Sequence, residues 1–341
     1  MVITQTEALL WTDGRYFLQA ERELAAEWTL MRMLDPGVPE VQDWLRSKAD
    51  IEVVGVDASL FSVAQAKKLQ EFLAPKSLRA IVNPVDRAWG AEQPPMPKSP
   101  VYVQPLEFAG VPWQEKVRQL QSALIAGEAA AVVVSMLDEV AWLFNIRGGD
   151  IEFNPVTVAY AVVTQSSAHL FVDEEKLDNT VKEHLRGVEL HPYVDIHAFL
   201  RSLADQIVWA DDSQNSWSIG MSLGGALRSK PSLIALPKSI KNEAELRGIR
   251  AAHIRDGVAL TAFLHWLNRE VTAGSTLTEH DVALKIGTTY VIVTVLTKLI
   301  LQRSSALKCN FTEVPRSLPL RGTVPTEQSF TTNPNPVILL H

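Results

Sequence analysis

Cysteine is almost absent from the 341-residue sequence, in which Cys309 is the only one. A lone cysteine excludes a disulfide within the chain and suits a reducing compartment. Long hydrophobic runs are also lacking. The most apolar segment, Tyr290–Leu301, is short and contains Lys298, whereas a membrane-spanning helix needs roughly 20 apolar residues. The N-terminus has no basic stretch followed by an apolar one, so no signal peptide is predicted. We therefore expect a soluble, cytoplasmic protein.

Positively charged residues are also fewer than negatively charged ones, 32 Lys and Arg against 39 Asp and Glu. The net charge is −7 and the isoelectric point is near 5.7. An acidic chain argues against nucleic acid or an anionic membrane as a partner. No G-x-G-x-x-G opens a predicted helix, so a dinucleotide-binding site is not expected. A Ser/His/Asp nucleophile arrangement is not predicted either.

Length and composition predict two or three domains, since 47% of the residues are hydrophobic. The hydrophobic pattern alternates between strands and helices. In the first part of the chain we expect strands at Val2–Thr4, Ala8–Trp11 and Val53–Val56, and helices at Tyr16–Met33 and Val63–Leu73, the second capped by Ser62. Ala91–Pro100 is rich in proline, which disfavours helix and sheet, and is the expected linker.

The segment that follows predicts an open mixed sheet with helices on its faces. The expected helices are Gln114–Ala126, a short one ending at Phe144 and opened by a Ser135–Asp138 capping box, Asp178–Leu185, Ile196–Asp205 and Ser216–Leu223. The expected strands are Ala129–Val134, Pro155–Thr164, His169–Val172, Val188–Leu190, Ile207–Ala210 and Leu233–Pro237.

A third part begins with Asn242 and Glu245, which are spaced as a helix cap and its partner three residues later. A long helix to about Val271 is expected. Its buried stripe should consist of Leu246, Ile249, His253, Val258, Leu260, Phe263 and Leu267. Thr276–Glu279 predicts the cap of a second helix.

The segment Leu137–Pro155, LDEVAWLFNIRGGDIEFNP, is the most specific stretch of the chain. It resembles the signature of the second domain of aminopeptidase P, the X-prolyl aminopeptidases among the creatinase-like metallopeptidases. Three further stretches are similar to the family's first-domain motif, to the lead-in of its second domain and to the entry of its pita-bread catalytic domain: Asp13–Tyr16 with Gln19, Val103–Gly110 and Ala235–Asp256. The resemblance extends over Val2–Leu284.

This resemblance implies an α/β fold of two creatinase-N-like mixed-sheet domains followed by the opening helix of the catalytic domain. The expected ranges are 1–100 and 112–237 for the sheet domains, 238–286 for the start of the metallopeptidase domain, and 287–341 for an aberrant, disordered tail. The first domain is expected to be incomplete, because strands that should flank Ala8–Trp11 and cover its hydrogen-bonding edges are missing.

The resemblance also implies a chemistry. Family members remove an N-terminal residue that precedes proline in a peptide, using two divalent ions, usually manganese, held by two Asp, one His and two Glu. Such a metal pair activates a bridging water. From Gly287 onward the only acids are Glu313 and Glu327, and the only histidine is His341. We therefore predict no metal site and no bound manganese in this chain.

The tail Gly287–His341 resembles nothing in the family. Codons for Pro315–Thr332 can be chosen so that a shifted reading frame spells SFPTIAGYGPNGAIIHY, which resembles the family's segment after its second catalytic-domain helix. This favours translated intron at Gly287–Gln302 and wrong-frame translation from Pro315 to the end, with a natural truncated isoform as the alternative. A tail of either kind should not pack against the rest of the chain.

Arg15 and Tyr16 are the candidate substrate-binding residues, because the family's N-terminal domains wall the active-site cleft. A role in a turn that begins a helix is the commoner alternative. Asp138, Glu139 and Asp150 could form a general-acid pair, but a structural network with Arg147 around the Gly148–Gly149 turn is the favoured interpretation.

The histidines receive structural interpretations. His184, His191 and His197 lack the spacing and acidic neighbours of a metal site, and we expect them at the surface or at strand edges. His253 lies on the apolar stripe of the long helix and is expected to be a hydrogen-bonded core residue.

Two functions of different class remain. The first is a piece of an Xaa-Pro aminopeptidase that is inactive in this form, so that its standing as an enzyme is open. The second is a non-catalytic isoform that forms a homodimer or pairs with the full-length enzyme.

Overall fold

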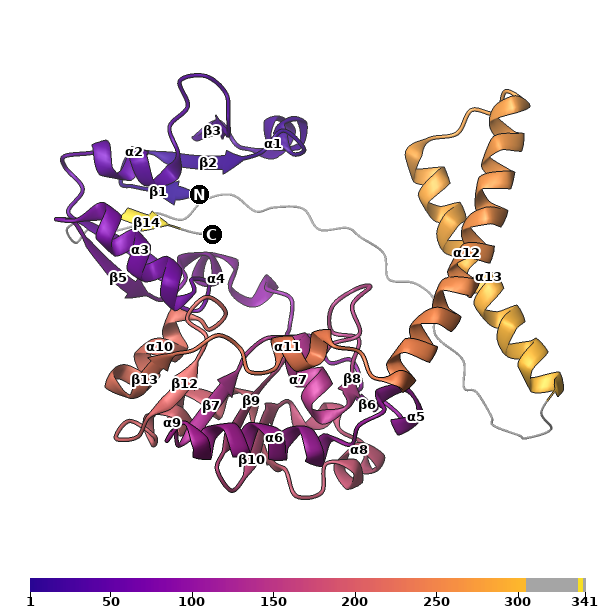
Figure 1. The fold of residues 1–341 in the computed structure, drawn as a ribbon. Helices are drawn as coiled ribbons and strands as arrows, with labels where there is room; N and C mark the ends of the chain where they lie inside the picture. The colour runs from indigo at the N-terminus through magenta and orange to yellow at the C-terminus, as the bar shows by residue number, and fades with distance from the viewer. Residues whose placement is uncertain (305–336, 340–341) are drawn as a thin grey trace. The chain divides into compact units, whose positions relative to one another are not determined.

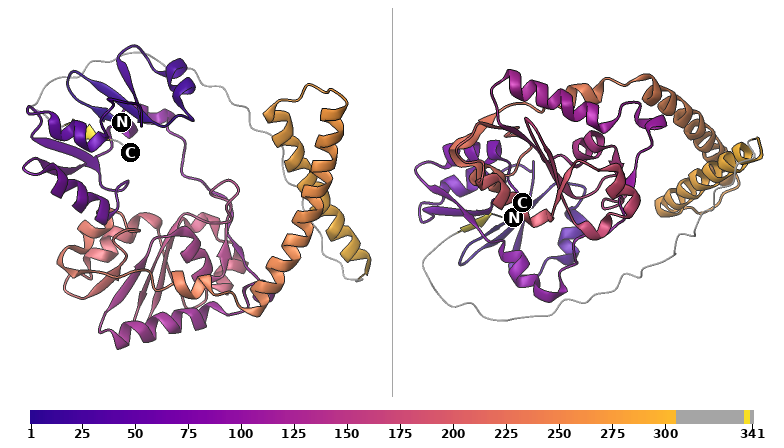
Figure 2. Two further views of the ribbon diagram at one scale, coloured as in Figure 1. Left: turned by 45° about the horizontal axis from the view of Figure 1, so that its top comes forward. Right: turned by 90° about the horizontal axis from the view of Figure 1, so that it is seen from below.

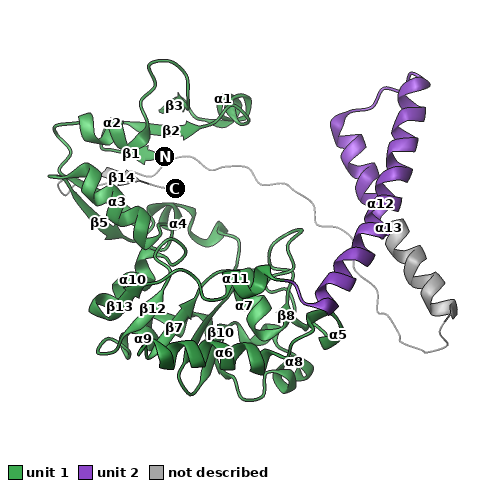
Figure 3. Cartoon of the chain, in the orientation of Figure 1, with its two compact units in different colours: residues 1–240, 332–341 green, residues 241–331 purple. Residues whose placement is uncertain are grey.

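The computed structural model describes residues 1–304 and 337–339, with side chains through residue 291. These residues form two compact units (Figure 3). One unit contains residues 1–240 together with the C-terminal strand, and the other is helical and begins at residue 241. The division lies close to residue 238, where the third domain is predicted to begin.

The first sheet has six strands in the order β3-β2-β1-β14-β4-β5 (Figure 1). The strands are β1 (Val2–Ile3), β2 (Ala8–Thr12), β3 (Trp28–Arg32), β4 (Val53–Asp57), β5 (Ser77–Ile81) and β14 (Val337–Leu339). β1 and β2 are antiparallel, whereas β3 is parallel to β2 and β5 is parallel to β4. The helices of this module are α1 (Phe17–Glu23), α2 (Val41–Ser47), α3 (Val63–Leu73) and α4 (Pro84–Trp89), followed by a 3-10 turn, η1 (Gly90–Glu92).

Helix α3 begins where the sequence predicts. The Ser62 hydroxyl accepts a hydrogen bond from the Gln65 backbone N–H, and the Gln65 side chain accepts one from the Ser62 backbone N–H. This reciprocal cap satisfies two donors that the first turn would otherwise leave unpaired. The helix then buries Leu73 in the same core cluster as Val54 and Val56 of β4.

The single helix predicted over Tyr16–Met33 is wrong. Helix α1 ends at Glu23, and Trp28–Arg32 forms β3, which pairs in parallel with all five residues of β2. The apolar residues Trp28 and Met31 fit a helical period. However, the aromatic Trp28 is followed directly by a β-branched residue, and this pair favours a strand. Pairing with β2 gives that stretch backbone hydrogen bonds along one side, and this decides its conformation.

The strand β14 corrects the expectation that the tail lacks packing. It lies between β1 and β4, antiparallel to the first and parallel to the second, with Ile338 opposite both Ile3 and Gly55. The edges predicted to be uncovered, those of Ala8–Trp11 in β2, are paired with β1 and β3, and β14 pairs with the facing edges of β1 and β4. The rest of the predicted tail from 305 to 336, and 340–341, lies outside the described residues.

The second sheet has the order β11-β10-β9-β7-β12-β13. Its strands are β7 (Ala131–Val134), β9 (Ala159–Thr164), β10 (Ala168–Val172), β11 (Glu189–His191), β12 (Val208–Ala210) and β13 (Leu227–Ser229). Its helices are α5 (Leu106–Ala109), α6 (Trp113–Ala126), α7 (Leu137–Phe144), α8 (Asn179–His184), α9 (Ile196–Arg201), α10 (Trp217–Leu223) and α11 (Ala235–Ser239), with 3-10 turns η2 (Glu174–Lys176), η3 (Tyr193–Asp195) and η4 (Gly224–Ala226). A separate two-stranded ladder joins β6 (Tyr102–Val103) to β8 (Ile146–Arg147).

Helices lie on both sides of this second sheet (Figure 2). Val132 and Val134 of β7 belong to the core cluster that includes residues of α6 and α7, whereas Ala131 and Val133 belong to the cluster that includes residues of α9 and α10. Successive residues of a strand point to opposite faces. The unbroken apolar run of β7 thus reflects burial on both faces, as predicted.

Two local predictions in this sheet are wrong. Leu233–Pro237 is not a strand: Leu227–Ser229 pairs with β12 instead, and Ile234 is buried against the core as the chain enters α11. Ser135 does not cap α7, because Met136 occupies the capping position and the Ser135 hydroxyl donates to the Gln214 carbonyl. Tertiary contacts took precedence over the local pattern in both places.

The two sheets are linked within their unit through the start of α3. The backbone N–H groups of Val63 and Ala64 donate to the carbonyls of Asn215 and Asp212 at 3.0 and 2.8 Å. A Cβ at Gly220 of α10 would lie 2.7 Å from a methyl group of Val63, so only glycine permits this approach without movement.

The predicted linker Ala91–Pro100 has no regular structure after η1, and its far end is fixed to the second sheet module. The Ser99 backbone N–H donates to a carboxylate oxygen of Asp150 at 3.2 Å, and its hydroxyl donates to the Gly149 carbonyl at 3.0 Å. Two residues further along the chain, the Val101 backbone N–H donates a hydrogen bond to the Lys176 carbonyl at 2.9 Å.

Asp150 and Lys176 form a buried ion pair at this anchor. The Lys176 ammonium lies 2.8 Å from the Asp150 carboxylate, and the two side chains are 3% and 0% exposed. The same carboxylate accepts from the Thr157 hydroxyl at 2.9 Å and from the Val158 N–H at 2.7 Å. Burial raises the pKa of Asp150, but the hydrogen bonds from Lys176, Val158 and Thr157 outweigh it and keep the pKa below its ordinary value.

The second unit consists of α12 (Glu243–Thr272) and α13 (Glu279–Ser304). The Asn242 cap is confirmed: its side chain accepts from the Ala244 and Glu245 N–H groups, and the Glu245 carboxylate accepts from the Asn242 N–H. The predicted stripe is mostly not buried. Only Phe263 of the predicted set is buried, Leu246 and Leu267 are half-buried, and Ile249, His253, Val258 and Leu260 are exposed. A pair of helices covers one narrow seam, whereas the stripe is broader.

Helix α13 also extends past the predicted change of character at Gly287. The Tyr290 hydroxyl donates to the Asp256 carboxylate of α12, so this part of the predicted tail does pack. None of the helices in the described part of the chain has the length and apolar character that a membrane crossing requires.

Replacing Asp150 with Ala should destabilise the protein by about 3–5 kcal/mol, because it leaves the Lys176 charge buried without its partner. Chemical denaturation at pH 7 measures this change. The matched control is Glu175→Ala, which removes the exposed pair with Lys98 nearby and should leave stability unchanged. Because the pKa of Asp150 is lowered on folding, its stabilisation is complete above the ordinary carboxyl pKa and is lost as the pH falls through the folded value. Equal effects of the two substitutions would contradict this account.

Replacing Ile338 with Pro should disrupt β14, because proline is poorly tolerated in a central strand. Hydrogen exchange should then accelerate at the amides of β1 and β4, while β7 in the other sheet keeps its protection. Unchanged exchange in β1 and β4 would show that β14 does not support these strands in solution.

Candidate functional site

The two predicted substrate-binding residues lie together on an exposed turn between β2 and α1. Arg15 donates from Nε and Nη2 to the two carboxylate oxygens of Asp13, at 2.9 and 2.8 Å. Its guanidinium lies 5.5 Å from the centre of the Tyr16 ring. The Arg15 side chain is 78% exposed and Tyr16 is 49% exposed. The turn thus presents a cation and a phenol ring to solvent.

The positive charge of Arg15 is largely neutralised by Asp13 within the same turn. Hydrogen bonds from the Arg15 side chain and backbone lower the pKa of Asp13 to about 2. The same pairing raises the pKa of Arg15. A ligand carboxylate would therefore compete with Asp13 for the guanidinium, whose planar fork suits bidentate carboxylate binding.

Three acidic residues of Leu137–Pro155 each contact a different partner. Asp138 pairs with Lys238 of α11, and the Glu139 carboxylate accepts from the Ser232 hydroxyl at 2.8 Å. Arg147 donates to the Ala141 and Ile146 carbonyls, and Asp150 is held by its buried partner. Each side chain has a structural partner, which favours the predicted network around the Gly148–Gly149 turn.

Burial raises the pKa of one of these acidic side chains, Glu139. The pKa of Glu139 is raised because desolvation outweighs the hydrogen bond from Ser232. Its neighbour Asp138, in contrast, is held by a lysine. The two carboxyl groups are bound to different partners on α11 and on the segment before it, so they do not converge on a common reacting atom.

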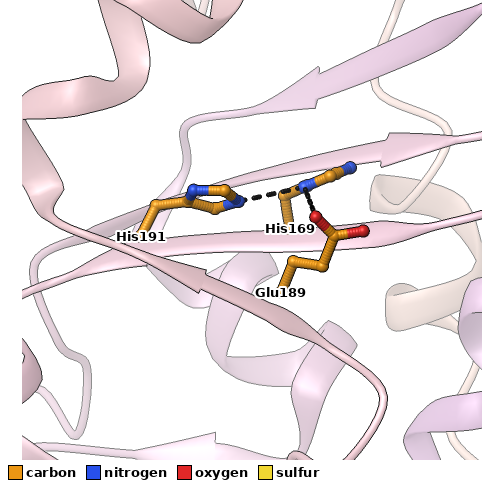
Figure 4. Close-up of side chains that lie close together, drawn as sticks. All are labelled: His169, Glu189 and His191. Atoms are coloured by element: carbon orange, nitrogen blue, oxygen red, sulfur yellow. Dashed lines mark hydrogen bonds and ion pairs between the residues drawn. The ribbon is translucent and has the colours of Figure 1, made fainter.

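Three side chains on the second sheet converge in a way that the sequence analysis does not anticipate. His169 of β10 and Glu189 and His191 of β11 each offer a ligand atom, and these atoms all lie within 4.8 Å of one another (Figure 4). His169 Nδ1 is 3.1 Å from His191 Nε2 and 3.5 Å from a Glu189 carboxylate oxygen. We call these three residues the His/Glu cluster.

The register of the two strands produces this convergence. β10 and β11 are parallel, with His169 opposite Glu189 and Phe171 opposite His191. Residues two apart on a strand point to the same face. Glu189 and His191 therefore share the face on which His169 lies, at the edge of the sheet.

The surroundings of the cluster are polar on one side and aromatic on the other. The Ser167 hydroxyl lies 2.7 Å from His169 Nε2. The ring of Phe171 stacks on His191 with centroids 4.7 Å apart, and Phe199 of α9 lies 4.6 Å from His169. Burial lowers the pKa of His169. His169 is buried, His191 is half-buried and Glu189 is exposed, so the cluster opens to solvent on the glutamate side.

The other histidines have separate partners. His184 Nε2 lies 2.9 Å from the Phe144 carbonyl, and His197 Nδ1 lies 3.0 Å from the Ser222 hydroxyl. For His191 the prediction of no acidic neighbour overlooked Glu189, which is two residues away. The signal was the E-x-H alternation on a strand, but His169 could be added only once the strand pairing was known.

The prediction that the chain has no G-x-S-x-G motif is wrong, because Gly220–Gly224 is such a sequence and Ser222 is its serine. The motif marks a serine nucleophile when it forms a sharp turn between a strand and a helix. Here Ser222 is inside α10 and its hydroxyl donates to the Ser218 carbonyl of the preceding helical turn. The structural context of a nucleophile is therefore missing at this serine.

The manganese pair implied by the family resemblance does not fit the residues that the structure describes. That pair takes four carboxylates and one histidine. Among the side chains described, those of residues 1–291, the His/Glu cluster is the one group of three or more ligating side chains that converge, and it offers two imidazoles and one carboxylate. No catalytic step through a manganese pair is derived from these residues.

Comparison with known proteins identifies the two sheet modules. Residues 1–88 and 92–245 each match the family described as Creatinase/Prolidase N-terminal domain. The chain is 42% identical over 286 residues to the Probable Xaa-Pro aminopeptidase P of Coccidioides posadasii (strain RMSCC 757 / Silveira), a match that covers 79% of this chain and 47% of that protein. It is 42% identical over 302 residues to the corresponding protein of Arthroderma gypseum, covering 84% and 48%. The chain thus spans about half the length of these curated relatives.

A solved structure agrees with this assignment. The X-prolyl aminopeptidase of Caenorhabditis elegans, described as a cytosolic enzyme with a di-nuclear active site, matches with a TM-score of 0.76 at 34% identity. The match covers 84% of this chain and 49% of that chain. The chain therefore belongs to the Xaa-Pro aminopeptidase P family, and its two sheet modules are the creatinase/prolidase N-terminal domains of that family.

Proposed function

We propose that this chain supplies the N-terminal part of a cytoplasmic Xaa-Pro aminopeptidase, which removes the residue preceding proline from peptides with the help of two divalent ions, manganese in the usual case. The identity of 42% to a probable Xaa-Pro aminopeptidase P over most of this chain is the observation that carries the proposal. The C. elegans relative, a cytosolic enzyme with a di-nuclear active site, supports the location and the metal pair.

In the form given by this sequence, the chain is proposed to be inactive in hydrolysis. The support is chemical: among the residues that the structure describes, the acidic side chains near the family signature are bound to structural partners. The ligand set that the family uses for its metal pair is not assembled there. What the described residues provide is a pair of stable sheet modules.

The 341-residue protein should not release the first residue of an Arg-Pro-Pro peptide, with or without added manganese. A full-length Xaa-Pro aminopeptidase assayed in the same buffer is the positive control. Manganese-dependent release above a no-protein blank would show that this chain has its own catalytic site.

A second candidate function is association with another copy or with the full-length enzyme. The exposed apolar residues of α12 favour it, since Ile254, Val258 and Leu264 are 70%, 54% and 52% exposed. Light scattering on the protein used for the activity assay tests this association. A monomeric mass, both for the protein alone and after mixing with the full-length enzyme, would exclude it.

Arg15 and Tyr16 are proposed as contacts for the peptide substrate. Their exposure supports the proposal, as does the ability of the guanidinium to exchange its Asp13 partner for a ligand carboxylate. In a longer protein that carries the whole catalytic domain, these residues would act by binding and take no part in proton transfer.

Arg15→Ala, introduced into such an active protein, should raise KM several-fold and leave kcat nearly unchanged, the pattern of lost uniform binding. Arg186→Ala is the matched control, because Arg186 is an equally exposed arginine, 78% accessible, paired with a nearby carboxylate. A KM that responds equally to both substitutions, or to neither, would remove Arg15 from the substrate site.

A further inference from the structure

We propose that His169, Glu189 and His191 form a binding site for one divalent transition-metal ion of the zinc class, which joins β11 to β10 at the sheet edge. The proposal concerns a site outside the aminopeptidase chemistry and does not depend on the proposed function. It rests on the convergence of the three ligand atoms shown in Figure 4.

The distances suit such an ion. Zinc binds histidine nitrogen and carboxylate oxygen at about 2.0–2.2 Å, so two ligands of a tetrahedral site lie about 3.4 Å apart. The corresponding separations from His169 Nδ1 are 3.1 Å to His191 Nε2 and 3.5 Å to the Glu189 carboxylate. An ion can therefore be accommodated by small movements of side chains.

The hydrogen bonds of His169 and His191 are also compatible with a bound ion. A ligating histidine usually donates its other ring N–H to a nearby acceptor, which fixes the tautomer and the ring. The Ser167 hydroxyl lies 2.7 Å from His169 Nε2 and provides that acceptor, which leaves Nδ1 with a free lone pair. Without an ion, one proton is shared along the 3.1 Å contact between His169 Nδ1 and His191 Nε2. For His191 to ligate through Nε2, its proton must lie on Nδ1, and the ion then takes the place of the shared proton.

Ligand type decides the class of ion. Two imidazoles and one carboxylate suit zinc, cobalt, nickel or copper, whereas manganese and magnesium prefer oxygen ligands. Three protein ligands leave a fourth position for water. That position is available here because the Glu189 side chain is 59% exposed, while Phe171 and Phe199 cover the opposite side of the imidazoles.

The site would act on an edge strand of the sheet. Among the described residues, β11 is three residues long and pairs only with β10. An ion held by residues of both strands would add a cross-link at that edge. Binding to the folded state alone stabilises it by mass action, so the ion should raise the thermal midpoint.

The test uses the full 341-residue chain with Cys309→Ser as the common background, so that the thiol cannot bind metal. After treatment with a chelator, zinc is titrated against a chromophoric competitor. We expect one tight equivalent per chain, a rise in thermal midpoint with zinc, and much weaker binding of manganese. Cobalt should give the absorption spectrum of a tetrahedral site.

Three variants and one control locate the ion. His191→Ala and Glu189→Gln should each weaken zinc binding by roughly 100-fold or more, and Ser167→Ala by about tenfold, the usual effect of an outer-shell partner. His197→Ala removes a half-buried histidine of the same module whose partner is Ser222, and should change nothing. Because Glu189 is exposed, Glu189→Gln remains informative if His191→Ala fails to fold. Zinc affinity that is equal in the background protein and in Glu189→Gln would show a plain histidine hydrogen bond and overturn the proposal.

Discussion

The second sheet module depends on the buried pair of Asp150 and Lys176. A carboxylate with no exposed surface requires a partner, and the lysine supplies it at 2.8 Å. Once placed, the same carboxylate orders the Thr157–Val158 backbone and receives the Ser99 N–H at the end of the proline-rich linker. One charge therefore fixes the Gly148–Gly149 turn, the entry to β9 and the junction with the first module.

This arrangement gives the charged residues of the family signature around residue 150 a structural explanation. Its acidic and basic side chains contact other parts of the domain. Asp138 pairs with Lys238, Glu139 accepts a hydrogen bond from Ser232, and Arg147 donates to backbone carbonyls. Replacing a buried member of this network, such as Asp150, leaves its partner without compensation, which is costly. A sequence pattern of this kind reports the architecture of the N-terminal domains.

Edges and surfaces differ between the two units. In the first sheet, β14 pairs on both sides and so converts two open edges into one continuous sheet. In the helical unit, the seam between α12 and α13 buries Ala259 and Phe263 of α12, whereas Ile249, Val258 and Leu260 of its apolar stripe are exposed. The sheet modules bury apolar residues in three core clusters, whereas α12 of the helical unit leaves several apolar side chains exposed.

Local signals in the sequence were sufficient for much of the fold. The caps at Ser62 and Asn242, the buried run of β7 and the proline-rich linker depend on neighbours in sequence, and each was predicted. Family membership also followed from the sequence, because the stretch Leu137–Pro155 and its companions are specific. The helix predicted over Tyr16–Met33 failed because β2 offered the same residues a strand partner, which no local pattern reveals.

The sequence by itself determined the two-module α/β architecture and the aminopeptidase P ancestry, since periodicity, caps and motifs are properties of contiguous residues. Tertiary structure alone decided which polar groups meet. Lys176 reaches Asp150 across 26 positions, and His169 reaches His191 across 22. The parallel register of β10 and β11 places His169 beside Glu189, and strand pairing of this kind is set by the packing of the whole sheet. The ligand geometry of a candidate metal site therefore exists only in the folded chain.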